Sequence, residues 1–378
     1  MRVLLAGLST RAIAESAVRA GCDVVTVDYF GDLDTKRLAP NTSLRERGSA
    51  YSAAALAQAA RGIAYDAVAY TGGLENHPEV LEGLIEGKEL LGNAPQTLRS
   101  VRDPAVLFPF LAAGGFAVPR TITFGQSASD DLPTAGRWLV KPVASGGGHG
   151  IRRWRGERPN PRQILQQYVA GIPASAAFVA DGRRAVLLGW SEQLHAPNRF
   201  RYGGNLVPLE APTATLEEVR HLIQALTARF RLVGLNGVDF VLRETRPVVV
   251  EVNPRYSASM ELVERATGAA MFALHVAGCR GGLPEATLAD AALRATGPSG
   301  VHGKAIVYAP RAVVVAASLS WMERGVRDVP HPGDVIAKGR PICTVLADGP
   351  SRAGCLAELR AAEADIVTSC VPSDGPTS

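Results

Sequence analysis

Residues 237–260 constrain the fold most, because two apolar, strand-like runs in this stretch bring polar side chains to one place. Asp239 lies in the first run. Glu251, Asn253 and Arg255 hold alternate positions at the end of the second run, so on an extended chain their side chains point the same way. Mg²⁺ is usually held by one or two carboxylates together with substrate phosphates. The stretch predicts either a magnesium–nucleotide site or an exposed hairpin with a solvated polar face, and the hairpin alone leaves both open.

Length, charge and cysteine content favour a multidomain protein that acts on small molecules. A chain of 378 residues is too long for one ordinary core, so we expect two or three domains that share a cleft. The net charge of +4 is slight, and Arg152, Arg153 and Arg155 suit a surface loop or a phosphate-facing lid better than a nucleic-acid surface. The five cysteines include no CxxC pair, which argues against a disulfide framework and a zinc site. Uncharged apolar runs are too short to span a membrane, so we expect a cytoplasmic protein.

The first 95 residues have the pattern of an α/β domain. Apolar runs and helical periodicity alternate, with elements expected at residues 3–6, 12–20, 24–27, 53–61 and 65–70. Gly7 is not followed by the second glycine that lets a pyrophosphate approach, so a dinucleotide site is disfavoured. We predict that Ser9, Thr10 and Arg11 face a ligand at the carboxyl end of the first strand. Glu75 follows the strand at 65–70, and it either contacts substrate or caps the next helix.

A lysine followed by a glycine-rich loop predicts a phosphate site. Lys141 lies near the end of the strand at 138–142, and residues 145–150 include four glycines. Such a loop exposes backbone N–H groups with little steric hindrance, so it can cover phosphates. It is not the loop that opens a helix in P-loop proteins, and we therefore expect a lid over the nucleotide. A mobile surface linker would explain the glycines but not the lysine.

The next segment predicts strands, a loop and a helix. Strands are expected at residues 164–169, 176–180 and 185–190. Residues 192–209 are expected to form a loop in which Arg201 and Tyr202 either cover an anionic or aromatic substrate or lie on an ordinary surface. Thr215 and Glu218 have capping-box spacing, which predicts that a helix begins there.

This order of parts resembles the ATP-grasp superfamily over roughly residues 1–280. Gly92-Asn93, Val101-Arg102-Asp103-Pro104 and Tyr202-Gly203-Gly204-Asn205 are similar to the branch that contains the tyramine–glutamate ligases of methanofuran biosynthesis. The resemblance implies an α/β fold with a Rossmann-like N-terminal domain, an ATP-grasp cleft of two α+β subdomains and a small β-rich C-terminal appendage. We divide the chain accordingly at residues 1–95, 96–165, 166–280 and 281–378, with a disordered tail from residue 373.

The resemblance also implies the nucleotide contacts. Lys141 would contact the α and β phosphates, and Arg102 would also contact phosphate. The lid over the β and γ phosphates would comprise Ser145, Gly146, Gly147, Gly148 and Gly150. Adenine would lie along Gln166, Gln167, Tyr168 and Val169, where a glutamine carbonyl replaces the usual acid. The usual ribose-binding acid is missing, and Ser175 is the candidate substitute.

Asp239, Glu251 and Asn253 would be ligands of one or two Mg²⁺ ions, for which Mn²⁺ can substitute, with Glu251 bridging. Their position after a lysine strand and a glycine lid favours this interpretation over a solvated hairpin. Lys141, Glu251 and Arg255 are the predicted catalytic residues, and Arg255 would face an acyl-phosphate.

The resemblance implies an ATP-dependent carboxylate–amine ligase that works with ATP and Mg²⁺ on a small-molecule acid and amine. Glutamate and an aromatic amine, as in methanofuran-type cofactor biosynthesis in one-carbon metabolism, are the expected substrates. A kinase or carboxylase of a small metabolite, a silent nucleotide sensor and a nicotinamide oxidoreductase are the alternatives. We expect neither nucleic acid nor membrane as a partner, and we leave open whether the protein forms a homodimer.

Overall fold

The N-terminal part of the computed structural model is a five-stranded parallel sheet with strand order β3-β2-β1-β4-β5. The structure describes residues 1–124, 132–133, 135–196, 200–285 and 300–373. The elements of the N-terminal part are β1 (Arg2–Ala6), α1 (Arg11–Arg19), β2 (Asp23–Asp28), α2 (Leu33–Leu38), β3 (Asn41–Ser43), α3 (Ala53–Ala60), β4 (Ala67–Tyr70), α4 (Pro78–Leu84) and β5 (Glu89–Leu91). The predicted βαβ units are present because each apolar run is buried on both faces, as parallel strands require.

A small four-stranded antiparallel sheet follows, with order β6-β9-β7-β8. Its elements, with the two helices that precede it, are α5 (Pro95–Val101), α6 (Pro104–Ala113), β6 (Thr121–Thr123), β7 (Trp138–Pro142), β8 (Arg152–Arg153) and β9 (Gln163–Gln167). Trp138, Val140 and Leu165 form its core together with Phe124. The glycine-rich loop connects β7 to β8, so it projects from the end of this lid sheet.

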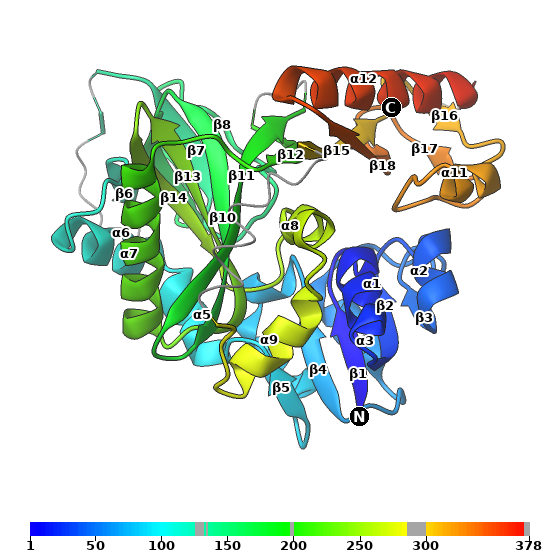
Figure 1. Ribbon diagram of the computed structural model, residues 1–378, viewed down its shortest axis with the longest axis horizontal. Helices are drawn as coiled ribbons and strands as arrows, with labels where there is room; N and C mark the ends of the chain where they lie inside the picture. Colours follow the sequence, from blue (N-terminus) through cyan, green and yellow to red (C-terminus); the bar gives the residue numbers. More distant parts are fainter. Residues whose placement is uncertain (125–131, 134, 197–199, 286–299, 374–378) are drawn as a thin grey trace.

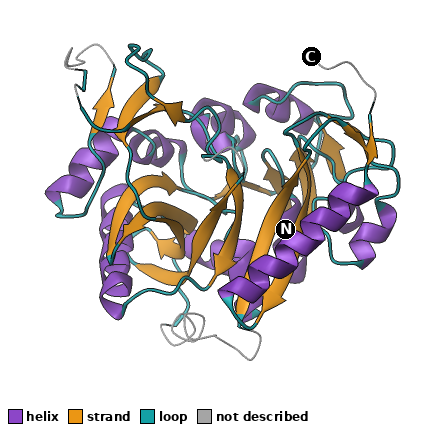
Figure 2. Ribbon diagram, turned by 90° about the horizontal axis from the view of Figure 1, so that it is seen from above, coloured by secondary structure: helices purple, strands orange, loops and turns teal. Residues whose placement is uncertain are grey.

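The largest sheet is antiparallel and seven-stranded, with order β14-β13-β10-β11-β12-β15-β18. Its strands and helices are β10 (Ile172–Asp181), β11 (Ala185–His195), β12 (Tyr202–Val207), α7 (Thr213–Phe230), β13 (Val233–Arg243), β14 (Arg246–Asn253), α8 (Met260–Thr267), α9 (Met271–Cys279), β15 (Val301–Tyr308), β18 (Pro341–Gly349) and α12 (Arg352–Ser369). Alternate residues of β10 serve different cores, because side chains of a strand point to opposite faces. Phe178 packs with α7, whereas Val179 packs with α9 and the N-terminal part. The helices α8 and α9 pack on this face and lie between the large sheet and the N-terminal part (Figure 1), and Figure 2 shows other helices along the outside of the strands.

The C-terminal segment continues the large sheet. The sequence predicts a β-rich appendage here, and β15 and β18 are indeed strands, but β15 pairs with β12 and β18 pairs with β15 in the seven-stranded sheet. A separate three-stranded sheet is formed by β16 (Val313–Val314), β17 (Val335–Ile336) and β19 (Val371–Pro372), next to α11 (Leu319–Glu323). The helix α12 packs on β15 and β18 (Figure 1). Most of the predicted tail, residues 374–378, lies outside the described residues.

Two local predictions are wrong. The expected loop at 192–209 is largely the hairpin of β11 and β12, because Tyr202, Gly204 and Asn205 pair with neighbouring strands. Residues 197–199 of that stretch lie outside the described residues. The helix α7 begins at Thr213 after Pro212, and the Thr215 hydroxyl donates to the Thr245 carbonyl instead of capping the helix. Proline fixes the backbone angle that precedes a helix, so it can start the helix without a capping box.

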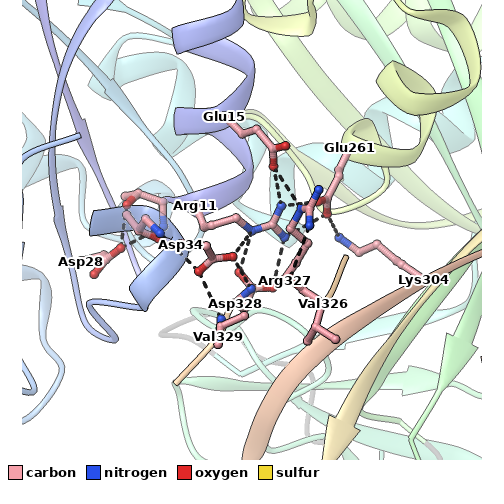
Figure 3. Close-up of polar contacts among 12 residues, drawn as sticks. Arg11, Glu15, Asp28, Asp34, Glu261, Lys304, Val326, Arg327, Asp328 and Val329 are labelled. Carbon is pink, nitrogen blue, oxygen red and sulfur yellow. Dashed lines mark hydrogen bonds and ion pairs between the residues drawn. The ribbon is translucent and has the colours of Figure 1, made fainter. Parts of the chain in front are cut away.

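A buried ion network joins the N-terminal part, α8 and the C-terminal segment (Figure 3). Arg11 is 1% exposed, and its guanidinium contacts Glu261 of α8 and Asp328. Lys304 of β15 donates to Glu261 at 2.8 Å. Burial would raise the pKa of Glu261, but the charges of Arg11 and Lys304 hold it well below its usual value. Removal of one partner would leave a buried charge without compensation.

We expect Arg11→Met to lower the free energy of unfolding by about 3–5 kcal/mol, because Glu261 and Asp328 would lose their shared cation. The control is Arg324→Met, whose side chain is 47% exposed and pairs with Asp365, which is 58% exposed, and we expect a loss of about 0–1 kcal/mol there. Chemical denaturation followed by circular dichroism measures both. Equal losses in the two variants would show that the network contributes no more than a surface ion pair.

The same network predicts a pH dependence of stability. Burial and the nearby charge of Asp328 raise the pKa of Asp34 to about 6, from an ordinary value of 3.8. The folded state therefore favours the protonated form, and this stabilisation is present below pH 3.8 and is lost as the pH rises through about 6. We expect Asp34→Asn to flatten the fall in unfolding free energy between about pH 4.5 and 7. Asp365→Asn, which changes an exposed acid on α12, should leave that slope unchanged, and an unchanged slope in Asp34→Asn would contradict the assignment.

Candidate nucleotide and magnesium site

The Lys141 side chain extends from β7 to β14, the edge strand of the large sheet. Its ammonium donates to the side-chain oxygen of Gln166 at 2.9 Å and to the Val250 carbonyl at 3.4 Å. Burial lowers the pKa of Lys141, and the charge of Glu251 opposes that shift. The predicted lysine is therefore a partly buried cation that faces an acid.

Asp239 and Glu251 lie directly opposite each other on β13 and β14. The register shifts immediately after this pair, so Val250 is an extra residue whose carbonyl is available to Lys141. Asn253 donates to Asp239 at 3.0 Å. The three predicted metal ligands thus lie together on one face of one hairpin.

The charges of this acid pair fit a divalent cation. Burial and the charge of Glu251 raise the pKa of Asp239 to about 7. Burial would also raise the pKa of Glu251, but the charges of Arg102 and Lys141 lower it. Among the described residues no group of three or more His, Cys, Asp or Glu side chains could hold a metal alone. Two carboxylates and an amide are hard oxygen ligands, so they suit Mg²⁺ that is also bound by phosphates.

Arg102 joins three parts of the molecule at this acid pair. It donates to Glu251 and to the Val252 carbonyl, and its other terminal nitrogen donates to the Asn76 side chain at 2.9 Å and the Ser145 carbonyl at 3.0 Å. It therefore lies between Glu251 and the start of the glycine-rich loop. A cation in this position can neutralise phosphate as well as Glu251.

The glycine-rich loop is closed in this structure. A cavity of about 50 Å³ is lined by Lys141, Ser145, Gly148 and Glu251 together with Arg102. Ligand pockets for drug-sized molecules are roughly 300–1,000 Å³, so ATP can enter only if the loop and lid sheet move away.

Arg255 and Glu75 form an ion pair between the large sheet and the N-terminal part. The Arg255 Nε donates to Glu75 at 2.8 Å, and its terminal nitrogens donate to the Asn253 side chain and the Tyr256 carbonyl. Glu75 is 1% exposed and accepts from the Gly73 N–H, and the helix α4 has no side-chain cap, so the capping alternative for Glu75 is wrong. Arg255 is thereby fixed beside the acid pair.

Tyr51 lies at the same place, and sequence reasoning missed it. Its hydroxyl is buried and has no hydrogen-bond partner among the described residues. It lies against Gly73, where an added Cβ would be 1.7 Å from the hydroxyl oxygen. Tyr51 belongs to no predicted motif, because it precedes α3 and is brought against Gly73 only by the fold.

The predicted adenine residues lie at the end of β9. Gln166 is buried, and its side chain is bonded to Lys141 and Thr121. The backbone N–H groups of Gln167 and Tyr168 donate to lid carbonyls, and the Arg137 guanidinium lies 4.6 Å from the Tyr168 ring centroid. Val169 follows β9 and is half-buried. These residues lie at the end of β9, an inner strand of the lid sheet, and the Gln166 side chain already binds the lysine.

Ser175 does not join the adenine residues. It lies opposite Asp239 in the β10–β13 register, and its hydroxyl bonds to Ser191 at 3.0 Å and Ser259 at 3.4 Å. This network belongs to the face beside the acid pair. A ribose role for Ser175 has no support in these contacts.

The side chains of the remaining predicted substrate residues mostly contact other parts of the protein. Thr10 donates to Asp28 at 2.6 Å, the Ser9 carbonyl accepts from Thr71, and Arg11 belongs to the buried ion network. The Arg201 guanidinium lies 4.3 Å from the Tyr308 ring centroid, and the Tyr202 hydroxyl bonds to Asn205. Two of the acids that bind Arg11, Glu261 and Asp328, are 250 and 317 residues away along the chain, so no local pattern predicts them.

Residues 102–259 match the family model of the ATP-grasp domain. A curated relative, the uncharacterized protein MJ0776 of Methanocaldococcus jannaschii, is 24% identical over 92% of this chain and 88% of its own length. The fold and the site therefore define an ATP-grasp domain. The similarity to this domain covers residues 102–259 of the 378-residue chain.

Solved structures share the fold over nearly the whole chain. The biotin carboxylase of Campylobacter jejuni has a TM-score of 0.72 at 14% identity and covers 98% of this chain and 92% of its own. The L-amino acid ligase of Bacillus licheniformis has a TM-score of 0.67 at 15% identity and covers 97% of both chains. For the pyruvate carboxylase of Rhizobium etli the TM-score is 0.73 at 15% identity, with 96% of this chain but only 37% of that chain covered. The predicted fold class is confirmed.

Among the described residues, no helix is long and apolar enough to cross a bilayer.

We expect Lys141→Met to weaken ATP binding by about 10- to 100-fold, because the partly buried ammonium that faces Glu251 would be lost. The control is Lys88→Met, which removes a lysine that lies 5.2 Å from the Tyr65 ring in the N-terminal part. Isothermal titration with a non-hydrolysable ATP analogue measures both affinities. An affinity equal to that of the unmodified protein would exclude a phosphate role for Lys141.

Proposed function

We propose that this protein is an ATP-dependent carboxylate–amine ligase that forms an amide through an acyl-phosphate and releases ADP and phosphate. The observation that carries the proposal is the position of Arg255 between the acid pair and the N-terminal part, held by Asn253 and Glu75. The Arg255 guanidinium lies next to the predicted metal–phosphate site, and Glu75 of the N-terminal part holds it in that position. That is where an acceptor carboxylate would meet the γ phosphate.

The residues serve the two steps as follows. In the first step a carboxylate oxygen of the acid attacks the γ phosphorus, the bond to the β–γ bridging oxygen breaks, and ADP leaves. Lys141 and the backbone N–H groups of the glycine-rich loop offset phosphate charge, and Asp239, Glu251 and Asn253 would hold Mg²⁺. Magnesium, when bound, supplies further neutralisation of the phosphates. Most of the rate enhancement would come from alignment and electrostatics, as in other phosphoryl transfers.

In the second step the amine nitrogen attacks the acyl carbon, the carbon–oxygen bond to phosphate breaks, and the nitrogen loses a proton. Arg255 would stabilise the oxyanion of the tetrahedral intermediate, since its guanidinium keeps N–H groups beyond those bonded to Glu75 and Asn253. Glu75 fixes the orientation of that guanidinium.

For the substrates we propose an amino acid such as glutamate as the acid and an aromatic amine. Tyr29, Phe30 and Tyr51 form an aromatic cluster, in which the Tyr29 ring centroid lies 5.1 Å from that of Phe30 and 6.2 Å from that of Tyr51. Tyr51 brings this cluster to Gly73, beside Glu75. An aromatic ring of a substrate can pack against this cluster. The L-amino acid ligase of similar fold supports an amino acid substrate.

A carboxylase that activates bicarbonate is the second candidate, because the C. jejuni biotin carboxylase shares the fold over 98% of this chain. The two candidates differ in the acid that is phosphorylated. ADP release that requires bicarbonate, and no organic acid, would favour the carboxylase.

We expect Glu251→Gln to reduce substrate-dependent ADP release by at least about 100-fold with the fold intact, because the acid opposite Asp239 would lose its charge. The control is Glu244→Gln in the exposed turn of the same hairpin, which should retain full activity. Pairs of acids and amines are screened for ADP, and hydroxylamine replaces the amine to trap the acyl-phosphate as a hydroxamate. Undiminished turnover of Glu251→Gln would contradict the metal assignment, and ADP without hydroxamate would contradict the acyl-phosphate.

A further inference from the structure

The glycine-rich loop rests on the tip of the β11–β12 hairpin, residues 200–202. The Tyr202 N–H donates to the Gly147 carbonyl at 3.0 Å. Gly148 has a φ of +73°, and an added Cβ would be 1.6 Å from the Phe200 carbonyl oxygen. Glycine is therefore required at 148 both for its backbone angle and for the close approach of the two chains. The tip is thus a docking point for the closed loop.

The C-terminal segment holds this tip in place. The hydroxyl of Tyr308, at the end of β15, donates to the Tyr202 carbonyl at 2.8 Å. The Arg201 guanidinium lies 4.3 Å from the centroid of the Tyr308 ring and also donates to the Gly339 carbonyl. Tyr202 is consequently bonded on one side to the C-terminal segment and on the other side to the glycine-rich loop.

We propose that Tyr308 is a positioning residue that sets how firmly the glycine-rich loop closes over the phosphates. The closed cavity is far too small for ATP, so the loop must leave the tip and return to it in each catalytic cycle. The Tyr308 hydroxyl fixes the partner to which the loop returns. Its effect on turnover rests on the proposed ligase function, whereas its effect on the loop does not.

The test uses Tyr308→Phe, which removes the hydroxyl but keeps the ring under Arg201. Loss of one typical hydrogen bond corresponds to about a fivefold change in an equilibrium. We therefore expect backbone amides of residues 145–150 to exchange hydrogen about fivefold faster in the nucleotide-free variant, measured by mass spectrometry.

The matched control is Tyr65→Phe in the N-terminal part. Tyr65 also donates to a backbone carbonyl, that of Leu84 at 2.9 Å, and also has a cation over its ring. Its loss should leave exchange in the glycine-rich loop unchanged. Arg201→Met is a second variant on the tip and should accelerate exchange in the same loop, which keeps the test informative if Tyr308→Phe folds poorly. Unchanged loop exchange in the tip variants overturns the proposal.

Kinetics separate this inference from the proposed function. Once a substrate pair is found, Tyr308→Phe should lower kcat about fivefold and leave the KM of the amine unchanged, since loop closure and not amine binding is affected. If no pair yields ADP, the ligase proposal fails while the exchange experiment still decides the role of Tyr308. If turnover is found and both kcat and loop exchange match the unmodified protein, the positioning role is wrong.

Discussion

Two like charges placed side by side organise the candidate site. Asp239 and Glu251 face each other across β13 and β14, and burial and mutual repulsion raise the pKa of Asp239 to about 7. Such a pair needs cations from elsewhere, because the neighbouring residues of its own two strands carry no positive charge. The surrounding architecture supplies them from separate parts of the chain: Lys141 comes from the lid sheet and Arg102 from the connection between α5 and α6.

Arg102 shows why the same cations can serve a nucleotide. In this closed structure its guanidinium binds Glu251, the loop carbonyl of Ser145 and Asn76 at once. When phosphates and a metal enter, charge is added on both sides of that guanidinium. A group that already joins the lid to the acid pair is then in place to join the lid to the substrate. The charge balance of the site thus links nucleotide binding to the position of the lid.

The periodic parts of the chain could be predicted from the sequence, and the parts that depend on distant packing could not. Buried strands, the lysine at the end of β7, the glycine-rich loop and the hairpin with Asp239 and Glu251 follow from local pattern. Their joint order then suggested the ATP-grasp fold. By contrast, the β-bulge that exposes the Val250 carbonyl leaves no local signal. Arg11 was predicted as a ligand contact because an arginine after a strand has that pattern, and only the fold shows that Glu261 and Asp328 surround it.

The connection from Arg255 to Glu261 explains why the N-terminal part matters for the proposed chemistry. Arg255 at its start is paired with Glu75, and Glu261 at its end is paired with Arg11, and both partners belong to the N-terminal part. In one pair the connection supplies the cation, and in the other pair it supplies the anion. A movement of the N-terminal part that separated one pair could therefore not be compensated by the partners of the other pair. Both ends of the connection are therefore fixed relative to one rigid sheet. In the proposed chemistry Glu75 would therefore help to orient Arg255 toward an acceptor beside the acid pair, and the acceptor site would include the N-terminal part as well as residues 102–259.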